Sequence, residues 1–274
     1  MALGFGSTAS SRSIHYMNQA KSAMDKSLLK ISSGSRLVSP GDDPAGLAVS
    51  MKIKNEIKLN EALSSNIGNA LSYANRQHEM LKYASETLSE MKNLKQQYTS
   101  AVANGDDTTS LQQSFENLSM SLHQLYEENF AGAKPLDQTS ELTVATSAYG
   151  LTSNWNGRIT LEAKDFRQLM DDHMQDTHIS GVHDIDSALN TTNEWLAQAG
   201  SDYSVLEIAS DNIALLNANL QEASDRITSV DLAEETANYA SLSMQYEAAA
   251  AAVAQANASA DTVFNLLMGS LGKS

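Results

Sequence analysis

Apolar side chains in the first half of the chain recur at alternating intervals of three and four residues. This spacing predicts a helix with one narrow apolar stripe, as at the seam of a coiled coil. Ten of twelve seam positions are apolar or aromatic: Leu63, Ile67, Ala70, Ala74, Gln77, Leu81, Ala84, Leu88, Met91, Lys95, Tyr98 and Val102. At 1.5 Å per residue such a helix is about 60 Å long, which indicates a rod.

Two further seams predict partner helices. One follows a break at residues 104–107, where Gly105 can end a helix and an aspartate can cap the next, so a helical hairpin is expected. Its seam positions are Leu111, Phe115, Leu118, Leu122 and Leu125. The other seam comprises Leu206, Ala209, Ile213, Leu216, Leu220, Ala223, Ile227 and Val230. The pattern predicts a mainly α fold, a long antiparallel helical rod or coiled coil formed by the N- and C-terminal halves.

The middle of the chain, residues 131–184, has a different pattern. Residues 141–147 and 158–162 favour short strands, and the stretch between them is rich in glycine and asparagine. We therefore expect a small β-hairpin, with Trp155 covering it.

Two segments carry a specific signature. Residues 28–50 read LLKISSGSRLVSPGDDPAGLAVS, in which Gly34 suits a helix C-cap and Asp42 or Asp43 an N-cap ahead of Pro44. These residues resemble the N-terminal signature of bacterial flagellins, and residues near the C-terminus resemble the flagellin C-terminal signature in the expected order. The positions that carry the resemblance are Leu28, Ile31, Ser33, Gly34, Arg36, Asp42, Asp43, Ala45, Gly46, Arg226, Ile227, Glu235, Gln255, Asn257, Leu266 and Leu267.

The resemblance implies a short flagellin without large outer domains, a structural subunit that polymerises with itself into the extracellular flagellar filament. These sixteen residues become candidate assembly residues, and an export chaperone, a cap and junction proteins become expected partners. The implied domains are terminal helices for inner assembly (1–45 and 230–274), a helical rod (46–130 and 185–229) and a surface segment (131–184).

Composition excludes several kinds of partner and binding site. The formal net charge of −15 repels nucleic-acid phosphates, and the absence of cysteine excludes disulfides and thiolate sites. No stretch reaches the roughly 18 apolar residues of a membrane span, so no membrane partner is expected. The N-terminus lacks the features of a signal peptide, so either the protein stays in the cytosol or it leaves by a route that needs no cleaved signal. The resemblance to flagellins implies the second, export without a cleaved signal.

The charge is also unevenly distributed. Residues 1–60 carry eight basic and four acidic side chains, whereas residues 161–274 carry four basic and eighteen acidic ones. One interpretation is ordinary solvated surface. The other is that the two ends attract each other, within a chain or between neighbouring chains.

Chemical motifs are weak. Residues 171–186 gather the divalent-metal ligands Asp171, Asp172, His173, Asp176, His178, His183, Asp184 and Asp186, but in a hydrophilic segment that favours solvated surface. No cofactor, metal ligand or catalytic residue is assigned, and an enzyme is not expected. Two alternatives to a filament flagellin stay open: a hook-filament junction protein, and a soluble coiled-coil adaptor.

Overall fold

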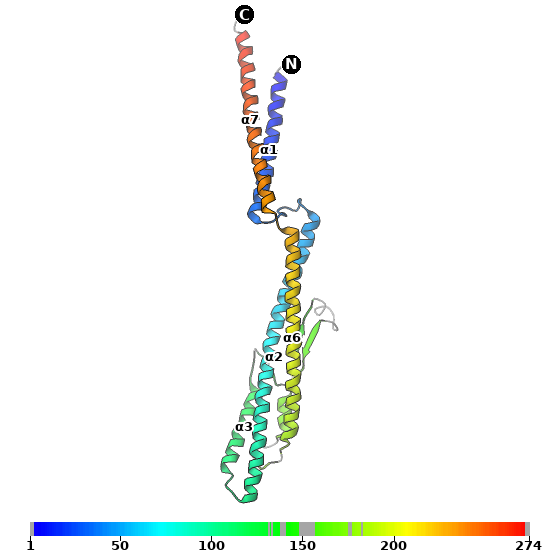
Figure 1. Cartoon of the computed structure of the whole chain (residues 1–274), viewed down its shortest axis with the longest axis vertical. Coiled ribbons are helices and arrows are strands. Elements are labelled where there is room, and N and C mark those ends of the chain that lie inside the picture. Colours follow the sequence, from blue (N-terminus) through cyan, green and yellow to red (C-terminus); the bar gives the residue numbers. More distant parts are fainter. Residues whose placement is uncertain are drawn as a thin grey trace. The chain divides into compact units, whose positions relative to one another are not determined.

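A computed structural model describes residues 3–130, 132, 134–137, 141–147, 157–174, 177–181 and 183–271, with the side chains of 3–10 and 266–271 left aside. Its elements are α1 (Leu3–Ser33), α2 (Pro44–Asn104), α3 (Thr109–Glu127), β1 (Leu142–Ala145), β2 (Arg158–Leu161), α5 (Phe166–His173), α6 (Ile185–Thr228) and α7 (Leu232–Leu271) (Figure 1). The prediction of a mainly helical chain with one small hairpin is confirmed. The chain divides into two compact units, Glu56–Leu220 and Met1–Asn55 with Gln221–Ser274.

The seam of α2 forms the centre of the unit Glu56–Leu220. Its nine positions from Leu63 to Met91 are all buried, as the three-four spacing predicted. Beyond them Lys95 and Tyr98 are half-buried, and Val102 is 54% exposed, so the seam ends earlier than expected. The reason is local: Val102 lies two residues before the end of α2, where the chain turns at Gly105 into α3.

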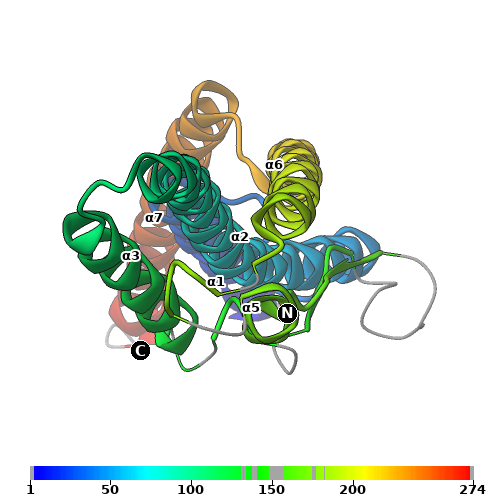
Figure 2. The same ribbon diagram turned by 90° about the horizontal axis from the view of Figure 1, so that it is seen from below.

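Helices α3 and α6 pack beside α2, and Figure 2 shows this unit from below. In α3, Phe115, Leu122 and Leu125 are buried against α2 and α5. In α6, residues near the start join the core around Met91, whereas Leu206 and Ile213 join the core around Leu63. Helices α2 and α6 therefore run antiparallel, as predicted.

One position of the α6 seam differs from the prediction. Leu216 is 43% exposed, although Leu206 and Ile213 of the same seam are buried. A strict seven-residue repeat drifts by about 20° per heptad around a straight α-helix. Leu216 therefore reaches the edge of the stripe, and the expectation of a continuous buried seam is wrong there.

The hairpin covers one side of the α2–α6 pair. Strands β1 and β2 are antiparallel, with Val144 opposite Ile159 and Leu142 opposite Leu161. Val144 and Leu161 are buried in the core that contains Leu63 and Leu206, so the alternating pattern of the strands supplies one apolar face. Trp155 and its assigned covering role lie outside the described residues.

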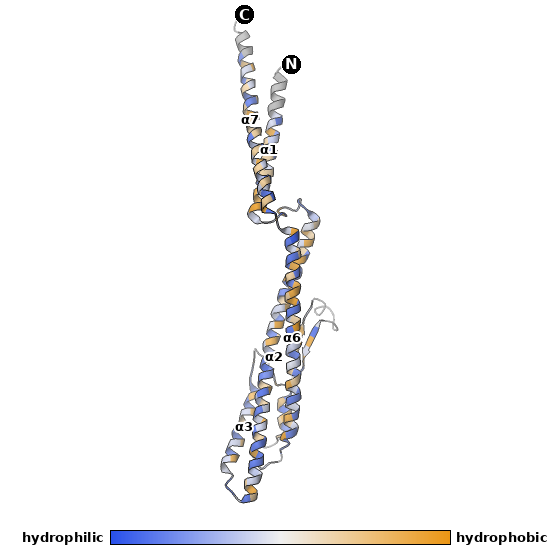
Figure 3. Ribbon diagram, viewed as in Figure 1, coloured by the Kyte–Doolittle hydropathy of each residue, from blue (hydrophilic) through white to orange (hydrophobic). Residues whose placement is uncertain are grey.

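The unit formed by both chain ends is packed differently. Helices α1 and α7 lie side by side in it, and the buried positions in its described side chains are small: Ala20, Ser27, Ser50 and Ser224. Small side chains let helix backbones approach closely but bury little apolar area. Figure 3 shows apolar positions along both helices, and many of the large ones are exposed.

Candidate assembly site

The segment that connects α1 to α2 is bonded to the connection between α6 and α7. Gly34 adopts φ +67° and ends α1, a conformation that favours glycine. Its carbonyl accepts a hydrogen bond from the Val230 amide at 3.2 Å, and the Arg36 amide donates to the Thr228 carbonyl at 2.8 Å. Ser35 and Ser229 form an antiparallel β-bridge between these two bonds. Segments nearly 200 residues apart are thus joined as a short two-stranded ladder.

We call this connection, residues 34–43 with residues 227–230, the joint. The side chain of Arg36 adds further contacts to it. Its Nε donates to the Ile227 carbonyl at 2.5 Å, and its guanidinium lies 3.8 Å from an Asp43 carboxylate oxygen. The carbonyls at a helix C-terminus lack intrahelical partners and favour a nearby cation. The arginine therefore satisfies the end of α6 while it contacts the start of α2.

The two aspartates before Pro44 have separate roles. Asp43 caps α2: its carboxylate accepts a hydrogen bond from the Gly46 amide at 2.9 Å. A Cβ on Gly46 would lie 2.3 Å from that carboxylate, so only glycine fits this first turn without a shift. The choice that the sequence left between Asp42 and Asp43 is settled in favour of Asp43.

Asp42 holds the connecting segment instead. Its carboxylate accepts hydrogen bonds from the amides of Val38 and Ser39 at 3.1 and 2.9 Å, and it pairs with Lys26 of α1. The hydrogen bond from Lys26, followed by that from Ser39, lowers the pKa of Asp42 from 3.8 to about 2. The carboxylate stays ionised and ties α1 to the segment that follows it.

Glu235 joins α7 to α1. Its carboxylate lies 3.5 Å from the Lys30 ammonium, and its backbone carbonyl accepts a hydrogen bond from the Ser27 hydroxyl at 3.3 Å. The Ser27 hydroxyl is the main cause that lowers the pKa of the Glu235 side chain, with Asn238 and Lys30 contributing. Opposite charges of the two chain ends do meet within one chain at this contact.

The other candidate residues have local contacts or exposed side chains. Arg226 pairs with Glu222 at 2.6 Å on its own helix and is exposed. Leu28, Ala45, Gln255 and Asn257 are exposed, and Ile31 is half-buried. Ser33 stays local, donating to the Lys30 carbonyl at 3.4 Å. Leu266 and Leu267 belong to α7, but their side chains are outside the described part.

Sequence reasoning missed Lys26 and Lys30, which anchor Asp42 and Glu235. The signal was available: two lysines stand one helical turn apart on α1, ahead of the acidic loop. The seam pattern drew attention to apolar spacing and left these polar positions unassigned.

The His/Asp cluster does not form a metal site in the described residues. There, no group of three or more His, Asp or Glu side chains is arranged to hold a metal ion. Instead, His183 Nε2 lies 2.8 Å from the His178 carbonyl, and Asp184 caps α6 by accepting from the Ser187 amide at 3.2 Å. Asp176 lies outside the described residues.

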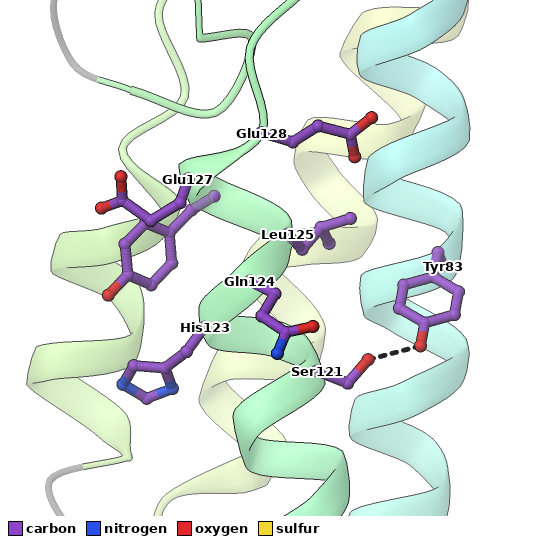
Figure 4. Close-up of a pocket in the computed structure, with 8 residues that line it drawn as sticks. Tyr83, Ser121, His123, Gln124, Leu125, Glu127 and Glu128 are labelled. Carbon is purple, nitrogen blue, oxygen red and sulfur yellow. Dashed lines mark hydrogen bonds between the residues drawn. The ribbon is translucent and has the colours of Figure 1, made fainter.

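A hollow of about 580 Å³ lies between α2 and α3 and is lined by the residues of Figure 4. The hydroxyls of Tyr83 on α2 and Ser121 on α3 point toward each other across it at 2.5 Å. One hydroxyl donates this hydrogen bond and the other accepts it, so the contact links the two helices. Among described helices, none is long and apolar enough to cross a membrane.

Comparison with known families agrees with this architecture. The model of the bacterial flagellin N-terminal helical region matches residues 7–141, and the model of the flagellin C-terminal helical region matches residues 182–267. The chain belongs to the bacterial flagellin family. This is a family of structural proteins, and as a member the chain is a structural subunit of a flagellar filament.

Three curated relatives match over nearly their whole length. A flagellin of Halalkalibacterium halodurans is 28% identical and covers 92% of this chain and 93% of its own length. The flagellar filament 33 kDa core protein of Treponema phagedenis is 26% identical, with 89% and 92% covered. A flagellin of Bacillus subtilis is 25% identical, with 94% and 97% covered. The chain is therefore similar in extent to these flagellins.

Proposed function

We propose that the terminal helices, residues 1–45 and 230–274, are the inner assembly domain of a helical homopolymer. The observation that carries this proposal is the exposure of large apolar side chains on helices that bury only small ones. On α1 and α7 these exposed residues include Tyr16, Leu28, Leu29, Met244 and Phe264. Exposed apolar surface of this extent is typical of an interaction site. Neighbouring copies of the same helices would cover it.

Residues 46–130 and 185–229 then form the rod, and residues 131–184 the segment that faces solvent. Support comes from the core of α2, α3 and α6, which buries large side chains such as Leu81, Leu88 and Phe115 within one chain. A repeated heterologous contact between such subunits builds an open helix when its rotation does not close.

The joint around Arg36, Asp42 and Asp43 has an assembly role in this proposal. It sets the path of the chain between α1 and α2 through two backbone hydrogen bonds, from the Arg36 amide to the Thr228 carbonyl and from the Val230 amide to the Gly34 carbonyl. Filament packing requires the terminal helices to leave the joint in a reproducible direction. Arg36 and the aspartates supply that direction with charge-assisted hydrogen bonds.

The remaining partners and the location follow from the same reasoning. An export chaperone would cover the exposed side chains of α7 before assembly, and cap and junction proteins would meet the subunits at the two filament ends. The filament would lie outside the cell, reached by export without a cleaved signal. Mass spectrometry of subunits from native filaments tests the last point: an N-terminus beginning beyond residue 2 would contradict it.

Electron microscopy of the concentrated, purified chain tests the central proposal. Long helical filaments are the expected result. Persistent small oligomers would favour a coiled-coil adaptor. Short assemblies that form only on the ends of added hooks would favour a hook-filament junction protein.

A further inference from the structure

Helix α6 carries a second apolar stripe that its own chain leaves uncovered. Val205, Ile208 and Leu215 are 46%, 61% and 63% exposed, and with Asn212 they keep the three-four spacing of a seam. The stripe lies away from the buried positions Leu206 and Ile213. Apolar residues at seam spacing on an exposed helix face indicate a partner helix.

Acidic side chains run along one edge of this stripe. Glu207 and Asp211 are one helical turn apart, and both are exposed. Neither forms an ion pair with any other residue in the described part of the chain, unlike Glu235 with Lys30. A partner with basic residues at the same spacing would complement this edge.

Helix α2 offers a face with that chemistry. Lys54 and Lys58 are exposed, one turn apart, and form no ion pair with the residues that the structure describes. Met51, three residues before Lys54, is 57% exposed and lies on the same side of the helix. The face thus combines one flexible apolar side chain with two unpaired lysines.

We infer that the α6 stripe binds the Met51–Lys54–Lys58 face of α2 in a second copy of this chain; this rests on the proposed function. In one subunit α2 and α6 run antiparallel. Subunits of an open helical polymer keep the same direction, so α2 of one copy is antiparallel to α6 of its neighbour.

The antiparallel alignment gives a definite register. Lys58 lies opposite Glu207 and Lys54 opposite Asp211, because the two lysines and the two acidic residues are each four positions apart. Met51 then lies near Leu215, one turn further along each helix. The two faces differ, so the contact is heterologous and leaves one free face of each kind at the ends of a growing row. Basic residues of the first half of the chain would then pair with acidic residues of the second half between chains, as Lys30 pairs with Glu235 within one chain.

Charge reversal tests the pairing in the full chain. Glu207→Lys with Asp211→Lys, and separately Lys54→Glu with Lys58→Glu, should each slow filament elongation from seeds by about tenfold. The fourfold variant with all changes should recover to within about twofold of the unaltered chain. A matched control, Glu86→Lys with Glu90→Lys, makes the same change in net charge as the first variant and should elongate normally.

Cross-linking supplies a second readout, since the chain has no cysteine of its own. Filaments of the Met51→Cys, Leu215→Cys variant should yield a ladder of covalent multimers with a short bis-maleimide. Each single variant, and the pair Val102→Cys with Leu215→Cys, should yield no ladder.

The two proposals fail in different ways. No filaments from the unaltered chain would contradict the proposed function and this contact with it. If filaments form, normal elongation of both charge-reversed variants, absence of rescue in the fourfold variant, equal loss in the control, or no ladder from the Cys pair would overturn the contact alone.

Discussion

The two units of the chain are both built from long helices, yet they bury different things. In Glu56–Leu220, helix α2 buries Leu63, Leu81, Leu88 and Met91 completely. In the unit of the two chain ends, the described side chains that are buried are Ala20 and three serines. The first unit has a core of its own, whereas the second gains little from packing within one chain. Similar helix content thus hides a difference in core packing, and the proposal that neighbouring copies complete the second unit rests on that difference.

The largest effect is expected from a charge in the core. Leu88→Asp places a carboxylate where no solvent reaches, and should cost about 4 kcal/mol of unfolding free energy or more. Leu216→Asp is the matched control at a half-exposed seam position of α6 and should cost far less. Thermal unfolding followed by circular dichroism measures both. Equal destabilisation by the two variants would contradict the described core.

Removal of α7 separates folding from assembly. A chain without residues 235–274 should stay soluble and helical, because the core around Leu88 is intact, but should form no filaments. Circular dichroism and sedimentation of the truncated chain provide the measurement. Filaments from it would show that the terminal unit is dispensable.

The joint should affect filament form more than monomer folding. Replacing Arg36, Asp42 and Asp43 together by alanine removes the α2 cap, worth about 1 kcal/mol, and the contacts to α6 and α1. Monomer helicity should change little, while filament yield or shape changes. The paired replacement of exposed Arg167 and Asp171 of α5 by alanine is the control. Unchanged filaments from the triple variant would refute an assembly role for the joint.

Acid should loosen the joint in a defined pH range. The pKa of Asp42 is about 2 in the folded chain and 3.8 ordinarily, so its stabilising contribution is present above about pH 4 and is lost as the pH falls toward 2. Carboxylate NMR titration of the monomer should show this low pKa. The pH dependence of melting should be weaker for Asp42→Asn than for Asp25→Asn, whose ion pair with Lys21 is exposed.

The smallest effect is expected in the hairpin connection. An epitope tag near Ser153, outside the described residues, should leave folding and elongation unchanged, because surface connections accept insertions at little entropic cost. Antibodies should then label the whole length of intact filaments. Labelling restricted to broken ends would contradict a solvent-facing hairpin.

The sequence alone determined the long helices, the strands and the helix breaks, but it did not predict α5 within residues 131–184 and left the cap of α2 open between Asp42 and Asp43. Seam spacing is a local property of a 3.6-residue helix, so it located the buried side of α2 from Leu63 to Met91, and turn residues located the breaks at Gly34 and Gly105. Only the tertiary structure decided which residues of the two chain ends meet. Pairing Asp42 with Lys26, Glu235 with Lys30 and Arg36 with the end of α6 depends on how distant helices align. The exposure of Leu216 also depends on the tertiary structure. The apolar stripe drifts around α6, and this drift exposes Leu216 only because α2 packs against one side of the helix.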